Sequence, residues 1–150
     1  MIIKKKFGSA KDFREFIEQN RSEFDKLYVK EIYNSGDAQP AESPLFLYSG
    51  YSVIMAFLSE GALSLNIYDK DFFIRHIRGR IFREEPDSEK FYYVYFSDSA
   101  LINCAVDDID ISENEGGTIK NIDLDFKNGK RLHAEASYSV NGTMNSYIAD

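Results

Sequence analysis

Residues 119–136 read IKNIDLDFKNGKRLHAEA, two alternating runs of apolar and polar side chains around a central Asn-Gly pair. Alternation with a period of two is typical of a strand with one buried face, and an Asn-Gly pair between two such runs indicates a hairpin. A two-residue loop would place Leu124 opposite His133 and so mix apolar and polar side chains on each face. A three-residue loop with Gly129 in the left-handed region pairs Leu124 with Leu132 instead. We therefore predict the bulged register.

The bulged register sorts the hairpin into two faces of different chemistry. On one face, Ile122 lies opposite Ala134. On the other face, Asp125 lies opposite Arg131 and Asp123 lies opposite His133. Opposite charges in directly facing positions stabilise a strand pair, so this is the register that a half-buried sheet would select.

The N-terminal part of the chain has a helical pattern. Ser9 precedes Asp12 by three positions, which is typical of a helix start where the serine oxygen accepts a backbone N–H. Apolar side chains then recur every three or four residues as far as Ile32 and form one face. We predict helix over residues 9–33, as one helix or as two short ones, because Asn20 interrupts the apolar face.

Residues 45–106 have the period of two that strands have. The clearest run is 62–68, which follows a turn at 59–61. Residues 51–58 are a strand or a buried helix, because a short apolar run fits both. Residues 39–44 are predicted as a loop that holds two prolines. Further strands are predicted at residues 73–83, 91–97 and 100–106.

These elements predict an α+β fold. We expect the N-terminal helix, or the two short helices, to pack on a curved antiparallel sheet of about seven strands. Strands do not alternate with helices along the sequence, which argues against a parallel nucleotide-binding sheet. At 150 residues the chain is predicted to form one domain over 1–150.

Composition excludes several classes of protein. Of the residues, 43% are apolar and only one is cysteine, which excludes intrinsic disorder, a disulfide scaffold and a cysteine-rich zinc module. The longest apolar runs, 53–58 and 91–96, are six residues each, whereas a membrane span needs about 20. We expect a cytoplasmic protein without a membrane partner.

Negative charge is concentrated in one part of the chain. The net charge is -7, and residues 107–125 hold seven carboxylates against Lys120 alone. Alternation in Asp108-Ile109-Asp110 predicts that the acids of this strand share one exposed face. Such a face repels phosphate backbones, so we expect no nucleic-acid partner. It is either a solvated surface or a docking surface for a basic protein. The acidic residues predicted to bind a partner are Asp107, Asp108, Asp110, Glu113, Glu115, Asp123 and Asp125.

Aromatic side chains could extend that surface. The run 91–96 is apolar or aromatic at every position, so one alternate set of side chains faces away from a one-sided core. Tyr93 and Tyr95 would then supply rigid contact area and hydroxyl groups to an interface. The alternative is a strand that is buried on both faces.

Catalytic signatures are missing from the sequence. There is no nucleophile elbow, phosphate loop or dinucleotide-binding glycine pattern. Asp108-x-Asp110-x-Ser112 begins like a calcium loop but has Glu113 where that loop needs glycine. His133 and Asp123 face each other across the hairpin and could form an acid–base pair, but an ordinary surface ion pair is the explanation that we favour. We expect no enzyme activity, cofactor or metal.

Three classes of function remain. The first is an inhibitor or immunity-type protein whose acidic, aromatic face occludes a basic partner such as a toxin nuclease. The second is a small-ligand-binding cup or barrel with an aromatic pocket, which could hold an Asp/His acid–base pair. The third is an assembly domain whose sheet edges pair in an oligomer. We favour the first, because it uses the charge distribution directly.

Overall fold

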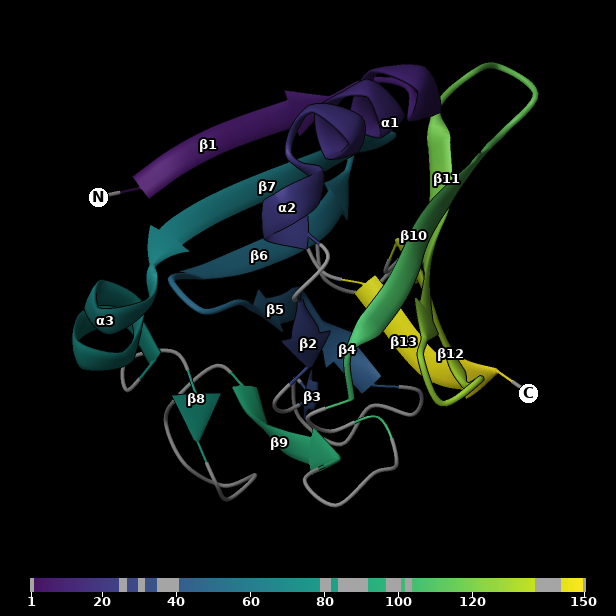
Figure 1. The fold of residues 1–150 in the computed structure, drawn as a ribbon. Coiled ribbons are helices and arrows are strands. Elements are labelled where there is room, and N and C mark those ends of the chain that lie inside the picture. The colour runs from purple at the N-terminus through teal and green to yellow at the C-terminus, as the bar shows by residue number, and fades with distance from the viewer. Residues whose placement is uncertain are drawn as a thin grey trace.

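The computed structural model describes most of the chain and shows an α+β fold (Figure 1). Its strands form two five-stranded sheets and one three-stranded sheet, and not the single curved sheet of about seven strands that we predicted. None of the helices among the described residues has the length and apolar character needed to span a membrane. The described residues are 2–24, 27–29, 32–34, 41–78, 82–83, 92–96, 101, 104–136 and 144–149.

The first sheet is antiparallel throughout and contains the first half of the predicted strand region. Of residues 51–58, which fitted strand or helix, residues 52–58 belong to a strand that forms a hairpin with its successor, as the turn at 59–61 predicts. In order across the sheet, the strands are β1 (Ile2–Phe7), β7 (Ala62–Asp69), β6 (Ser52–Ser59), β5 (Leu45–Tyr48) and β2 (Tyr28–Val29).

The second sheet contains the hairpin predicted within residues 119–136. Leu124 pairs with Leu132 and Gly129 has a φ of 85°, so the bulged register is confirmed. The turn is closed by the N–H of Phe126, which donates to the carbonyl of Lys130 at 2.9 Å. In order, the strands are β10 (Val106–Glu113), β11 (Ile119–Phe126), β12 (Arg131–Ala136), β13 (Met144–Ala149) and β4 (Ala41–Ser43).

The third sheet is small and partly parallel. Its strands are β3 (Ile32–Asn34), β9 (Tyr92–Phe96) and β8 (Phe82–Arg83), in that order. β8 and β9 run parallel, whereas we predicted an antiparallel sheet. β9 confirms the strand predicted at 91–97.

The N-terminal helix begins as predicted and ends early. α1 (Ala10–Gln19) is capped by Ser9, whose hydroxyl oxygen accepts the N–H of Asp12 at 3.2 Å. Asn20 ends it, since its side-chain amide donates to the carbonyl of Phe16 at 2.9 Å. Among the described residues up to 33, α2 (Arg21–Phe24) is the only helix that follows, so the prediction of helix to residue 33 was wrong. β2 and β3 replace it, because pairing with distant strands outweighs a local helical period.

Three further predictions were wrong in part. The strand predicted from residue 73 begins instead as a π-helical segment, η1 (Phe73–Arg78), which follows directly on α3 (Lys70–Phe72). Asp69 caps α3 through its side chain, and Phe73 is fully buried below it. The predicted loop at 39–44 includes β4. Of the strand predicted at 100–106, the structure describes residues 101 and 104–106. Leu101 lies in a turn, Ala105 forms an isolated bridge with Tyr28, and Val106 begins β10.

One apolar core joins the two large sheets and α1. Leu65 of the first sheet, Leu124 of the second and Phe13 of α1 belong to the same buried cluster. Figure 1 shows α1 lying across the ends of β1, β7 and β10. The opposite face of the first sheet packs against α3 and η1, where Phe73 contacts Tyr48 and Tyr68. β5 is therefore buried on both faces.

The turn between β6 and β7 also connects the two large sheets. Glu60 and Gly61 both have positive φ, 53° and 76°, as a two-residue hairpin turn requires. The carbonyl of Gly61 accepts the N–H of Ile119 at 2.8 Å. A Cβ atom on Gly61 would lie 2.8 Å from the Cβ of Thr118, so this close approach depends on glycine.

We predict that Gly61→Ala lowers the free energy of unfolding by about 1–3 kcal/mol, because it adds backbone strain and a steric clash between the sheets. Urea unfolding followed by circular dichroism measures the change. Gly50→Ala is the matched control, since a Cβ atom there meets nothing within 4 Å. Equal effects of the two substitutions would contradict this account of the turn.

Candidate functional site

The register of β10 on β11 brings four aspartates together. Asp108 lies directly opposite Asp125, and Asp110 lies directly opposite Asp123. Directly opposite residues of an antiparallel pair point to the same face, with Cβ atoms about 5 Å apart. Like charges in that position destabilise the pair. We call these four residues, together with the exposed Asp107 at the adjoining bulge, the acidic face.

Two of these aspartates are paired with arginine. Asp125 accepts two hydrogen bonds from Arg131 of β12, at 2.7 Å from Nε and 3.0 Å from Nη2. The pairing across β11 and β12 that places them together was predicted from the hairpin register. Asp110 accepts a longer hydrogen bond of 3.4 Å from Arg14 of α1. More than half of each of these two side chains is exposed. The first pair has the better geometry, because a bidentate guanidinium matches a carboxylate.

Asp123 is buried and forms part of a network around His133. Its Oδ1 lies 2.7 Å from Nδ1 of His133, and its Oδ2 accepts the side-chain amide of Asn121 at 2.9 Å. The Nε2 of His133 lies 2.9 Å from Oε1 of Glu135. The imidazole is thus held between two carboxylates, and it can donate to both only when it is protonated.

The environment of His133 raises its pKa. Burial opposes the charged form, but the hydrogen bonds and negative charges of Glu135 and Asp123 outweigh it. Both ring nitrogens are occupied by these partners, and only 18% of the side chain is exposed. This geometry suits an ion pair that joins β11 and β12. It does not present a free ring nitrogen to a substrate, as an acid–base pair would need.

The other predicted acidic residues have fewer ion-pair and hydrogen-bond partners. Within the described chain, Asp107, Asp108 and Glu115 are exposed and make no ion pair. Glu113 is committed to the fold, because its Oε1 accepts the N–H of Ala10 at 2.7 Å and so caps α1. The acidic face therefore includes five of the seven acids, and the other two lie at the end of β10 and in the turn that follows.

The two predicted tyrosines lie elsewhere in the topology. Tyr93 and Tyr95 belong to β9, which pairs with β3 and β8 in the third sheet. β10 and β11 belong to the second sheet, so the register does not align these tyrosines with the acidic face. Their side chains are outside the described part of the structure. Their proposed role in binding stays a prediction.

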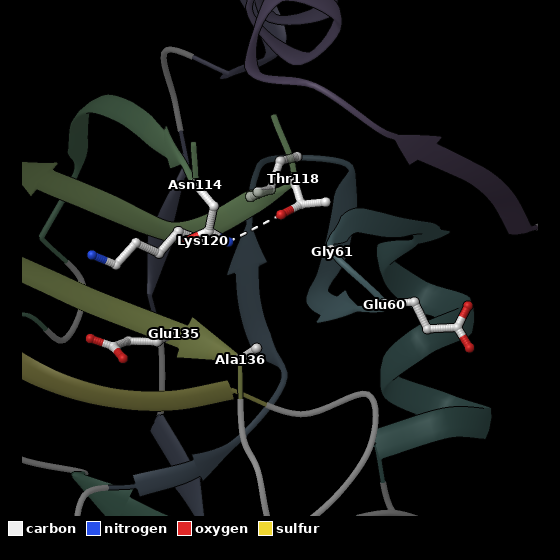
Figure 2. Close-up of a pocket in the computed structure, with 8 residues that line it drawn as sticks. Glu60, Gly61, Asn114, Thr118, Lys120, Glu135 and Ala136 are labelled. Carbon is white, nitrogen blue, oxygen red and sulfur yellow. Dashed lines mark hydrogen bonds between the residues drawn. The ribbon is translucent and has the colours of Figure 1, made fainter. Parts of the chain in front are cut away.

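Two cavities lie next to this region. The larger, of about 360 Å³, is between the β6–β7 turn and the ends of β10, β11 and β12. Figure 2 shows Lys120 and Glu135 extending in one direction from neighbouring strands, whereas Glu60 points the opposite way. Asn114 donates to the hydroxyl of Thr118 at its rim. The smaller cavity, of about 270 Å³, lies between α1 and β10. Neither lining includes Phe or Tyr, which the ligand-cup alternative requires.

Some residues that bond to the predicted site residues were not themselves predicted from the sequence. Glu135 could have been found, because the predicted register already placed it two residues from His133 on the same face. Asn121 follows from the same alternation. Arg14 could not, since it reaches Asp110 from 96 residues away and its position depends on how α1 packs.

Comparison of the chain with protein-family models, with curated proteins and with solved structures gave no match. Among the described residues, no group of three or more His, Cys, Asp or Glu side chains is placed to hold a metal ion.

We predict that His133 stabilises the fold more in mild acid than in mild base. A group with a raised pKa in the folded state contributes fully below its unfolded value, near 6.5, and the contribution is lost as pH rises through the folded value. The difference in free energy of unfolding between wild type and His133→Gln should therefore be larger at about pH 5.5 than at about pH 9.

Urea unfolding at both pH values measures this difference. Glu135→Gln serves as the control, because it keeps the imidazole and removes one of the groups that raise its pKa, so the gain in acid should shrink. A His133 contribution that grows with pH would contradict the assignment.

Proposed function

We propose that this chain is a non-enzymatic binding protein of the inhibitor or immunity type. Its acidic face would dock on a basic protein, such as a toxin nuclease, and occlude the surface that binds phosphate groups. The carboxylates would take the positions that substrate phosphates occupy.

The observation that carries the proposal is the incomplete neutralisation of the acidic face. Asp125 has a close cationic partner in Arg131 of β12, Asp123 pairs with His133 of the same strand, and Asp110 has a loose cationic partner on α1. Asp108 faces Asp125 directly and has no cation of its own among the described residues. Because opposed like charges cost stability, a cationic side chain supplied by a partner would gain both a new ion pair and relief of repulsion.

Exposure supports the same proposal. Asp107 and Asp108 are exposed at the bulge where the register of β10 shifts, so a partner can approach them without moving the core. Bulges re-aim side chains and often lie beside functional sites. An excess of negative charge on one face also accelerates encounter with a basic protein at low salt.

We predict that Asp107→Lys combined with Asp108→Lys weakens partner binding about tenfold or more at low salt. The substituted residues have no ion pair in the described structure, so the fold should persist. The partner is first captured from native lysate on immobilised wild-type chain, then purified, and its affinity is measured by calorimetry at several salt concentrations.

Glu15→Lys combined with Asp71→Lys is the matched control, because it changes the net charge equally at exposed positions outside the acidic face. The control should bind like wild type. A partner that is acidic, or one whose affinity is the same for both double variants, would overturn the proposal.

A further inference from the structure

The outer edge of β10 has a short unpaired stretch of backbone between two closed ends. At one end, the N–H of Val106 donates to the carbonyl of Leu27 at 2.8 Å. At the other end, the guanidinium of Arg14 donates to the carbonyl of Ile111 at 3.2 Å. Among the described residues, nothing bonds to the outward backbone groups between these two points. The open stretch is about 13 Å long, at roughly 3.3 Å per residue.

The bulge decides which backbone groups face outward. Val106 and Ile111 both direct backbone groups away from β11, although five positions separate them. Strict alternation would make residues five apart face opposite ways, and the register shift between Val106 and Asp108 removes the conflict. With the parity set by Ile111, the N–H and carbonyl of Ile109 also face the open edge.

A groove runs beside this edge. It is the cavity of about 270 Å³, with α1 and α2 on one side and β10 on the other. Ile17 and Ile109 supply its apolar part. Asp108 and Asp110 flank Ile109 and point to the acidic face. The groove is lined by Arg14, Ile17, Glu18, Arg21, Asp108, Ile109 and Asp110.

We propose that an extended segment of the basic partner adds to the second sheet as a sixth strand along β10. The inference rests on the proposed function and specifies how the same site binds. Exposed strand edges are templates for such pairing, in which backbone hydrogen bonds give affinity and alternate side chains give specificity.

The negative charges of Asp108 and Asp110 determine which side chains the added segment should have. Lysine or arginine at every second position would lie beside Asp108 and Asp110 on the acidic face. The intervening side chains would face the groove at Ile17 and Ile109, so they are apolar and small enough to fit there. The segment that adds to β10 is therefore a strand of alternating basic and apolar residues.

A set of three synthetic peptides tests the backbone contact separately from the charge. The parent is an eight-residue peptide of alternating lysine and valine. Two derivatives carry N-methyl groups on all valine amides or on all lysine amides, so the charge is unchanged. Only one of the two sets of amides can face β10 when the segment pairs as a strand. Binding to the full-length wild-type chain is measured by NMR titration and amide exchange.

We expect one methylated peptide to bind like the parent and the other about tenfold more weakly or worse. The amide of Ile109 should become protected from exchange with the parent peptide. If the two methylated peptides bind equally, whether tightly or not at all, no strand adds to this edge. In that case a captured basic partner that still needs Asp107 and Asp108 would leave the proposed function standing. Loss of that dependence would remove the function itself.

Discussion

Two pairs of aspartates oppose each other across β10 and β11, and the electrostatics of the second sheet depend on them. A hairpin normally places unlike charges or neutral groups in such positions, because directly facing carboxylates repel. Here the repulsion is offset from outside the pair, by Arg131 and His133 on β12 and by Arg14 on α1. The offset is uneven, and Asp108 receives none of it in the described structure.

This unevenness links the fold to the proposed role. β11 lies between β10 and β12, and its two aspartates are hydrogen-bonded to side chains of β12, the other strand of the hairpin. β10 is the edge, so its aspartates depend on whatever lies beyond the sheet. α1 reaches one of them and leaves the other open to solvent. A basic partner would complete the edge electrostatically, and an added strand would complete its hydrogen bonding.

Much of the second sheet could be predicted from the sequence, because its information is local. The alternation on both sides of Gly129 determines the turn, the register and the pairing of Asp123 with His133. Ser9 likewise marks the start of α1. What failed was determined by distant contacts. Residues 28–29 and 32–34 belong to a stretch with a helical period, yet they form β2 and β3 because β5 and β9 are available to pair. Phe73 becomes helical because a pocket of aromatic rings on the first sheet receives it.

The candidate site divides in the same way. Alternation was enough to place Asp108 and Asp110 on one face. It could not show that Arg14 would pair with Asp110, or that a carboxylate of β10 would accept a hydrogen bond from the N-terminus of α1. Neither could it show that Glu113 serves as a cap. The surplus charge is therefore smaller than the sequence count suggests, and it is focused at the bulge of β10.

The most direct test is the stability of Asp108→Asn as a function of salt. If Asp108 repels Asp125, the amide should raise the free energy of unfolding by about 0.2–1 kcal/mol at low salt. The gain should shrink as salt rises from about 10 mM to about 1 M, because the screening length falls from about 30 to about 3 Å. A variant that is less stable than wild type, or a gain that salt does not change, would contradict the account.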